Sequence, residues 1–109
     1  MSYELFQSEK TERYYFRLKA GNGEIILASE AYNQKAGAEN GIASVSKNAA
    51  DESKFERRKA KDGQDYFVLK AGNGEIIGKS EMYKSAAGME NGIKSVMKNA
   101  KGATKDLTA

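Results

Sequence analysis

The chain has 109 residues and a formal net charge of +3, with 39% hydrophobic and 30% charged residues, and it contains no Cys, His, Pro or Trp. Its length predicts a single domain, and its hydrophobic fraction is adequate for a folded core. Without Cys there is no disulfide, thiol nucleophile or Cys-based metal site, and without His the usual proton shuttle and the commonest transition-metal ligand are missing.

The first part of the chain predicts three short strands. Residues Tyr3–Gln7 alternate weakly, and Tyr14–Ala20 alternates apolar and polar side chains with the period of two expected of a half-buried strand. Gly21-Asn22-Gly23 then predicts a turn, because Asn and Gly tolerate the positive φ angles of tight hairpins. Residues Glu24–Ser29 should therefore return antiparallel to the second strand.

The register of this hairpin has two solutions. A two-residue turn pairs Leu18 with Leu27, whereas a three-residue loop with Gly23 in the left-handed conformation pairs Leu18 with Ile26. We favour the second pairing, because Leu27 is replaced by Gly78 later in the chain while Ile26 returns as Ile77.

After Tyr32 the apolar period changes to that of a helix. Asn33 or Gln34 would open this first helix, and Ser85 is a better N-cap for a second one. Asp51–Ser53 is expected to link the two halves of the chain, and Thr104–Thr108 to form a final short strand. The apolar stripes of the two helices are Ala38, Gly41, Ile42, Val45 and Ala49, and Met89, Gly92, Ile93, Val96 and Ala100.

The chain is an internal duplication. When Tyr15–Ala49 is laid on Tyr66–Ala100, 25 of the 35 positions are identical. The sequence thus predicts an α+β domain of residues 1–109 made of two β-β-β-α(-β) repeats, about 1–53 and 54–109. The repeats would form one antiparallel sheet covered by two helices, with pseudo-two-fold symmetry, in a monomer.

These repeated segments carry a family resemblance. The motifs are Phe-x-Leu-Lys-Ala-Gly-Asn-Gly-Glu-Ile-Ile, Ser-Glu-x-Tyr and Glu-Asn-Gly-Ile-x-Ser-Val, each present twice, and the chain resembles a tandem-repeat member of the YegP-like family of small uncharacterised bacterial proteins. The resemblance implies tandem β-β-β-α-β units in a single sheet, with the C-terminal strands exchanged between units. It implies no reaction, ligand or catalytic residue. An exchanged strand of the first unit would fall on residues 54–59, which the repeat assigns to the opening strand of the second.

Several residues are candidates for catalysis or binding. The two Gly-Asn-Gly segments lack the third glycine of a dinucleotide fingerprint and precede strands, which favours structural turns over phosphate sites. Asp62-Gly-Gln-Asp65 lacks calcium-loop spacing and predicts another hairpin turn. The duplicated carboxylates have no neighbouring nucleophile or base, and the duplicated Ser and Tyr side chains fit strand ends and helix entries. These pairs are Glu24/Glu75, Glu30/Glu81, Glu39/Glu90, Ser29/Ser80 and Tyr32/Tyr83.

The basic run at the start of the second repeat is the most suggestive feature. Residues 1–53 hold 6 basic and 8 acidic side chains, whereas residues 54–109 hold 12 and 7. With Tyr66 and Phe67 nearby, the run could contact the phosphates of a polyanion beside stacking surfaces. Alternatively, these cations protect an exposed strand edge from aggregation. The candidate polyanion contacts are Lys54, Arg57, Arg58, Lys59 and Lys61.

Three functions therefore stand as hypotheses. The leading one is a non-catalytic binding or accessory module with an unknown ligand and partner. The alternative is weak, sequence-independent nucleic-acid binding through the second repeat, and the least favoured is a carboxylate- or Ser/Tyr-based enzyme. The first ten residues hold no apolar stretch of signal-peptide type, and the longest apolar runs are four residues. We accordingly expect a soluble, cytoplasmic protein without membrane contact and without a cofactor.

Overall fold

The computed structural model describes residues 2–108 and contains two β-β-β-α units followed by a seventh strand. In each unit an antiparallel three-stranded meander precedes a helix of 14 residues. The elements are β1 (Ser2–Gln7), β2 (Tyr14–Lys19), β3 (Ile25–Ala28), α1 (Lys35–Asn48), β4 (Phe55–Lys59), β5 (Asp65–Lys70), β6 (Ile76–Lys79), α2 (Ala86–Asn99) and β7 (Ala103–Asp106). A single 3-10 turn, Glu52–Lys54, joins α1 to β4.

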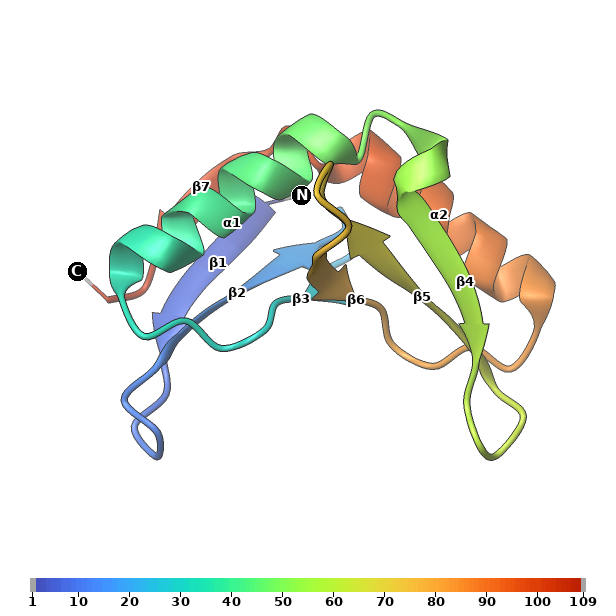
Figure 1. Ribbon diagram of the computed structural model, residues 1–109, viewed down its shortest axis with the longest axis horizontal. Helices are drawn as coiled ribbons and strands as arrows, with labels where there is room; N and C mark the ends of the chain where they lie inside the picture. The colour runs from blue at the N-terminus through green and yellow to red at the C-terminus, as the bar shows by residue number, and fades with distance from the viewer. Residues whose placement is uncertain (1, 109) are drawn as a thin grey trace.

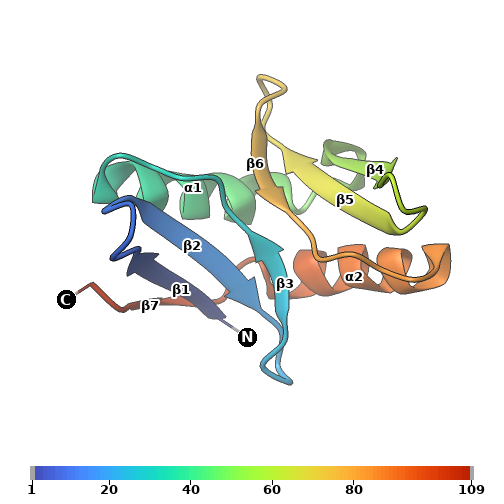
Figure 2. The same ribbon diagram turned by 90° about the horizontal axis from the view of Figure 1, so that it is seen from below.

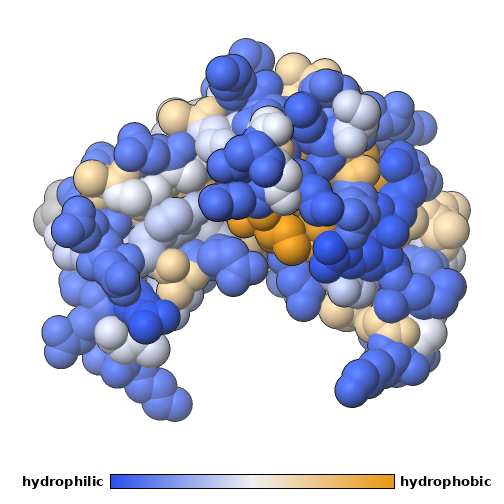
Figure 3. All heavy atoms as spheres, in the orientation of Figure 1, coloured by the Kyte–Doolittle hydropathy of each residue, from blue (hydrophilic) through white to orange (hydrophobic). Residues whose placement is uncertain are grey.

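All seven strands form one sheet in the order β4-β5-β6-β3-β2-β1-β7. The two meanders meet where β3 pairs with β6 through Ala28 and Lys79. Both helices cover the same face of the sheet, and the hairpin tips of β1–β2 and β4–β5 point away from them (Figures 1 and 2). The molecule therefore has the shape of an arch (Figure 1). Figure 3 shows an apolar patch on the inner side of the arch, near the junction of β3 and β6. The predicted α+β class, with two helices over one sheet, is confirmed.

The sheet differs from the expectation in one strand pair. β7 lies parallel to β1, so the sheet is mixed rather than antiparallel throughout. β7 belongs to the second repeat but pairs with the first, as the family resemblance implies. Only the second repeat contributes such a strand to the other repeat. In the first repeat, the 3-10 turn takes the place of β7, and residues 55–59 form the opening strand of the second repeat. β4 therefore ends the sheet with one edge open.

The core lies between the helices and the upper face of the sheet. The predicted helix stripes face it, and all their members are buried except Ile42, which is half-buried. The hydroxyl of Tyr3 donates a hydrogen bond to the carbonyl oxygen of Ala100 at 2.6 Å, which ties β1 to the end of α2. The largest fully buried side chains are Tyr3, Phe16, Phe67, Leu5, Leu18, Leu27, Leu69, Ile93, Val45, Val68 and Val96.

Glycines allow the helices to approach the sheet closely. A Cβ atom on Gly41 would lie 2.5 Å from the hydroxyl oxygen of Tyr32 and 2.7 Å from Cε2 of Phe16 on β2. Gly92 is similarly placed against Tyr83 and Phe67. A glycine inside a helix costs about 1 kcal/mol relative to alanine, and this close packing offsets that cost. The prediction that both glycines face the sheet is confirmed.

Leu27 and Gly78 occupy equivalent positions in the two repeats, where β3 and β6 meet. Leu27 is fully buried, and its side chain covers Gly78. A Cβ atom on Gly78 would lie only 2.6 Å from Cδ2 of Leu27. The centre of the core thus has room for one of the two side chains, which explains why the repeats differ here.

The favoured hairpin register is wrong in one respect. Gly23 does adopt the left-handed conformation, with φ of 86°, but Leu18 pairs with Leu27 rather than with Ile26. Next to the turn, Lys19 pairs with Ile25, as the favoured register requires. A β-bulge at Ile26 then adds one residue, so that from the pair Leu18–Leu27 onward the strands follow the register of the two-residue turn.

The helices begin at the predicted positions. Ser85 caps α2 by accepting a hydrogen bond from the N–H of Gly88, whereas Gln34 precedes α1 without a side-chain cap.

Candidate functional site

Arg57, from the basic run, is held by acidic side chains. Its guanidinium binds both carboxylate oxygens of Glu90 on α2, one of them at 2.8 Å, and lies 3.4 Å from Glu52. This hydrogen bonding lowers the pKa of Glu90 and raises that of Arg57. Arg57 occupies the position equivalent to Leu5, which is buried beside β7 in the first repeat. An ion pair therefore stands at the open edge of β4, where a charged side chain discourages strand addition.

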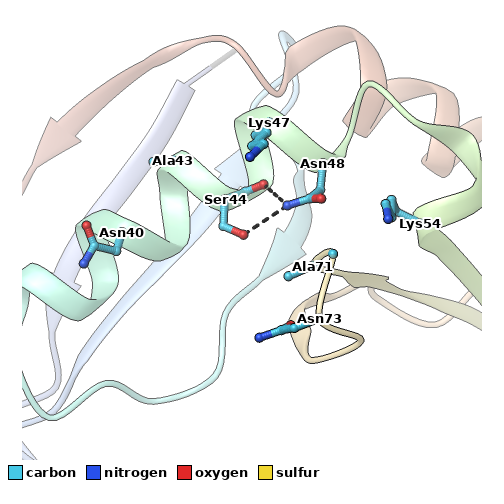
Figure 4. A pocket seen from close by; sticks show the side chains of 9 residues that line it. Asn40, Ala43, Ser44, Lys47, Asn48, Lys54, Ala71 and Asn73 are labelled. Carbon is cyan, nitrogen blue, oxygen red and sulfur yellow. Dashed lines mark hydrogen bonds between the residues drawn. The ribbon is translucent and has the colours of Figure 1, made fainter.

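The other members of the run are spread over different surfaces. Arg58 pairs with Glu56, and Lys59 lies 3.1 Å from Asp65. Lys61 is exposed in the β4–β5 turn, and Lys54 lies before β4 on the helix side of the molecule (Figure 4). The structure thus does not gather the five cations on one surface.

The duplicated serines are structural. The hydroxyl of Ser29 accepts a hydrogen bond from the N–H of Phe16 at 2.9 Å and donates one to the carbonyl of Glu30 at 2.8 Å. Ser80 makes the same two bonds, to Phe67 and Glu81. These bonds hold the β2–β3 and β5–β6 pairs together where each second strand ends.

The duplicated tyrosines also support the fold. Tyr32 stacks on Phe16 with ring centroids 6.2 Å apart, and Tyr83 stacks on Phe67 at 6.3 Å. Burial raises the pKa of both phenols, so that they remain neutral. Of the duplicated carboxylates, only Glu90 forms an ion pair within residues 2–108.

The Gly-Asn-Gly segments are hairpin turns, as predicted. In the second turn, Oδ1 of Asn73 accepts a hydrogen bond from the N–H of Glu75 at 3.0 Å, and Gly74 has a positive φ of 85°. The Asp62 turn is built in the same way, with Gly63 at 88°. Each Gly-Asn-Gly turn, however, also lies against the helix of the other repeat.

This contact creates a hollow on each side of the molecule. Hollow 1, of about 650 Å³, lies between the C-terminal half of α1 and the β5–β6 turn. Asn40 and Asn48 line it from the helix, Asn73 from the turn, and Lys54 from the segment before β4 (Figure 4). Its full lining is Asn40, Ala43, Ser44, Lys47, Asn48, Lys54, Ala71, Gly72 and Asn73.

Hollow 2, of about 470 Å³, is its counterpart between α2 and the β2–β3 turn. Seven of its eight lining residues are the identical equivalents of residues in hollow 1, and the eighth, Lys94, corresponds to Ala43. The identical pairs are Asn40/Asn91, Ser44/Ser95, Lys47/Lys98, Asn48/Asn99, Ala71/Ala20, Gly72/Gly21 and Asn73/Asn22.

The lining groups are amides, hydroxyls, ammonium groups and backbone. The amide of Asn48 donates hydrogen bonds to the carbonyl oxygen of Ser44 at 2.8 Å and to its Oγ at 3.2 Å (dashed lines in Figure 4). Asn99 and Ser95 repeat this arrangement in hollow 2. These bonds fix the asparagine side chains along the helix surface and give each hollow a preformed polar wall.

Sequence reasoning missed both hollows. It interpreted the glycine turns correctly but had no means to place them against the helix of the other repeat. The signal available was the identity of exposed polar side chains, such as Asn40 with Asn91 and Lys47 with Lys98, on helix faces that point away from the core.

Residues 2–108 contain neither a carboxylate metal centre nor a membrane-spanning helix. No group of three or more Asp and Glu side chains is arranged to hold a metal ion in this part of the chain. Likewise, neither of its two long helices has the length and apolar character needed to cross a bilayer.

Comparisons with known proteins agree with the duplication. A family profile described as a domain of unknown function, DUF1508, matches the chain twice, at residues 10–56 and 60–106. A UPF0339 protein of Bordetella pertussis is 58% identical over 97 residues, covering 88% of this chain and 87% of the relative. The UPF0339 protein YegP of Yersinia pestis is 54% identical over 100 residues, covering 91% of this chain and 89% of the relative.

Two solution NMR structures share the fold. A UPF0339 protein of Shewanella oneidensis is 52% identical, with a TM-score of 0.90 over 96% of this chain and 89% of the other. YegP of E. coli, described as a protein of unknown function, is 47% identical, with a TM-score of 0.90 over 96% of this chain and 90% of the other. The chain therefore belongs to the DUF1508 family of bacterial UPF0339 proteins, whose domain it carries twice in tandem.

Proposed function

We propose that this chain is a non-catalytic binding module that holds one small ligand in each of its two hollows. The observation that carries the proposal is the repetition of the polar lining: seven residues are the same in both hollows. Volumes of about 650 and 470 Å³ also fall within the usual range of small-molecule sites, which is roughly 300–1,000 Å³.

One repeated pair of the lining, Asn40 and Asn91, has no evident role in folding. The side chains of Asn40 and Asn91 are exposed, and neither makes a hydrogen bond to any other described residue. Elsewhere on the same helices, polar positions have diverged, since Ser46 is replaced by Met97. The repetition of these two exposed asparagines supports a shared ligand in the two hollows.

The chemistry of the lining favours binding over catalysis. Among residues 2–108 no carboxylate lines either hollow, and the chain has no His or Cys. General base catalysis usually relies on one of these groups with a pKa tuned to the task. Asparagine amides, a serine hydroxyl and ammonium groups can instead recognise the polar atoms of a ligand.

The test is a screen of a library of small metabolites by two-dimensional NMR of the whole chain. We expect binding compounds to shift the amide signals of Gly21 and Gly72 together, with two equivalents bound. Asn40→Ala should weaken binding in hollow 1 alone and Asn91→Ala in hollow 2 alone. The matched control is Asn33→Ala, since Asn33 is an exposed asparagine outside both hollows. Compounds that bind only elsewhere would contradict the proposal, as would turnover of a bound compound.

Nucleic-acid binding is the alternative, and one observation favours it. The sheet face opposite the helices carries Arg58 directly across from Tyr66, and Lys79 lies over the ring of Tyr66 at 5.1 Å. Aromatic rings beside cations suit single-stranded nucleic acid. Binding should then fall steeply with salt and weaken when Arg58 and Lys79 are replaced by Ala. A low-salt titration without binding would reject this alternative.

A further inference from the structure

We infer that the ligand of each hollow is a small anion, recognised through its carboxylate or phosphate group; the inference rests on the proposed function of the hollows. The described residues that line each hollow include two lysines and no acidic side chain: Lys47 and Lys54 in hollow 1, and Lys94 and Lys98 in hollow 2. Two ammonium groups beside one cavity repel each other, and a bound oxyanion converts this repulsion into attraction.

These four lysines differ from many other cations of the chain. Arg17 and Lys19 share Glu4, at 2.7 and 3.3 Å, and Lys70 lies 2.8 Å from Glu56. By contrast, no carboxylate of residues 2–108 lies within ion-pair distance of a hollow lysine. The hollow lysines therefore form no ion pair within residues 2–108, and the attractions of Lys94 to Glu90 and of Lys54 to Asp51 act at longer range.

One lysine of each hollow occupies an equivalent position in the two repeats, and the other does not. Lys47 and Lys98 are equivalent, and both stand in the last helical turn, where a cation also complements the helix dipole. That explanation does not extend to Lys54, which precedes β4, or to Lys94, whose equivalent is Ala43. The repeats have thus diverged in sequence at these positions while each hollow keeps two positive charges, as expected if the charge serves binding.

The turn adds hydrogen-bond donors to the positive charge. Oδ1 of Asn73 is already occupied by the N–H of Glu75, so its amide NH₂ is left to donate, and it points beneath α1 toward hollow 1 (Figure 4). Asn22 has the same bond, to the N–H of Glu24 at 3.0 Å, beside hollow 2. Amide N–H and ammonium donors on one cavity match the acceptor oxygens of a carboxylate or phosphate.

The experiment titrates the whole chain with inorganic phosphate and, separately, with citrate, following backbone amide signals by NMR. Sodium chloride at matched ionic strength and neutral glucose serve as reference titrations. We expect the signals of Gly72 and Asn73 in hollow 1 and of Gly21 and Asn22 in hollow 2 to shift and saturate with phosphate, with citrate, or with both. The stronger of the two anions identifies the source as phosphate or carboxylate.

Charge-removing variants assign the effect to each hollow. Lys54→Gln should weaken anion binding in hollow 1 about tenfold, which corresponds to about 1.4 kcal/mol, and should leave hollow 2 unchanged. Lys94→Gln should do the reverse. Lys10→Gln, at an exposed lysine outside both hollows, should change neither.

Two results would overturn the inference. Anion binding that both hollow variants leave intact would do so, because the lysines would then play no part. So would the binding of neutral compounds in the hollows when neither anion binds; in that case the hollows remain binding sites and only the ligand class is wrong. If no compound of any charge binds in either hollow, the proposed function fails as well.

Discussion

The contact between Leu27 and Gly78 makes the centre of the core a sensitive place to test the packing. Gly78→Ala is expected to destabilise the protein by about 1–3 kcal/mol through overpacking. The added Cβ atom would lie 2.6 and 2.7 Å from Cδ2 and Cγ of Leu27, whereas contacting carbon atoms normally lie about 3.5–4.0 Å apart. Gly78 has no positive φ, so this cost arises from packing rather than from the backbone. Leu27→Ala should cost about 2–5 kcal/mol, because Leu27 is fully buried.

The two substitutions should not be additive. In the Leu27→Ala background the new methyl group of Gly78→Ala enters vacated space, so its cost should vanish or change sign. The coupling free energy should be within about 0.5–3 kcal/mol. Urea unfolding of the four proteins, followed by circular dichroism, measures it directly. Each kcal/mol should also move the melting temperature by about 4–8 °C for a domain of this size.

A sharper version exchanges the two residues. Because the positions are equivalent in the two repeats, the chain with Leu27→Gly and Gly78→Leu should supply the same leucine from the other side of the sheet junction. It should therefore recover most of the stability that Leu27→Gly alone loses. Strictly additive effects, or an exchanged chain no more stable than Leu27→Gly, would refute the idea that one space is shared.

Four further predictions follow from packing, charge and topology. Gly41→Leu should destabilise by about 1–3 kcal/mol in urea unfolding, because Tyr32 and Phe16 leave no room; a neutral effect would contradict the helix-face assignment. Arg57→Leu should remove the ion pair that guards the β4 edge and cause self-association, which light scattering would detect as a mass above the monomer. The pKa of Asp106 is lowered to about 2, from an ordinary value of 3.8, chiefly by its hydrogen bond to Lys35. Its contribution to β7 docking is therefore present above pH 3.8 and lost as the pH falls through about 2, so the β7 amide signals should shift in that window and Asp106→Asn should abolish the shift. A chain that ends at Asp51 should be unfolded or dimeric, because it lacks both β7 and the other half of the sheet; a folded, monomeric half would favour two independent domains.

The elements were predictable because their signals are local. Alternation marks strands such as β2, the Asn-Gly turns mark the hairpins, and the stripe through Gly41 and Val45 marks the buried side of α1. The pairing of Leu18 was not predictable in this way, because a bulge at Ile26 shifts the register by one residue without leaving a pattern in the sequence. Where local signals permit two solutions, the packing of the finished sheet selects one.

The hollows were beyond local reasoning for a different physical reason. Hollow 1 joins Ser44 on α1 to Asn73 in a turn of the other repeat, and only the tertiary fold brings these residues together. The same holds for Arg57, whose partner Glu90 is 33 residues away. The basic run looked like a polyanion patch because the sequence does not show which carboxylates pair with its cations, and Glu90 lies far from Arg57 along the chain.

The position of β7 has a consequence for synthesis of the chain on the ribosome. β1 is completed at Gln7, but the strand that covers its outer edge begins only at Ala103. At translation rates of roughly 5–20 residues per second, the nascent chain carries this unpaired edge, with Leu5 exposed beside it, for several seconds. The edge of β4 is protected by Arg57, whose partner Glu90 is made only 33 residues later. The edge of β1 has no such protection until β7 has been made. Among the described strands, the one made first thus has its outer edge covered last, and we expect chains cut short before β7 to aggregate more readily than the whole chain.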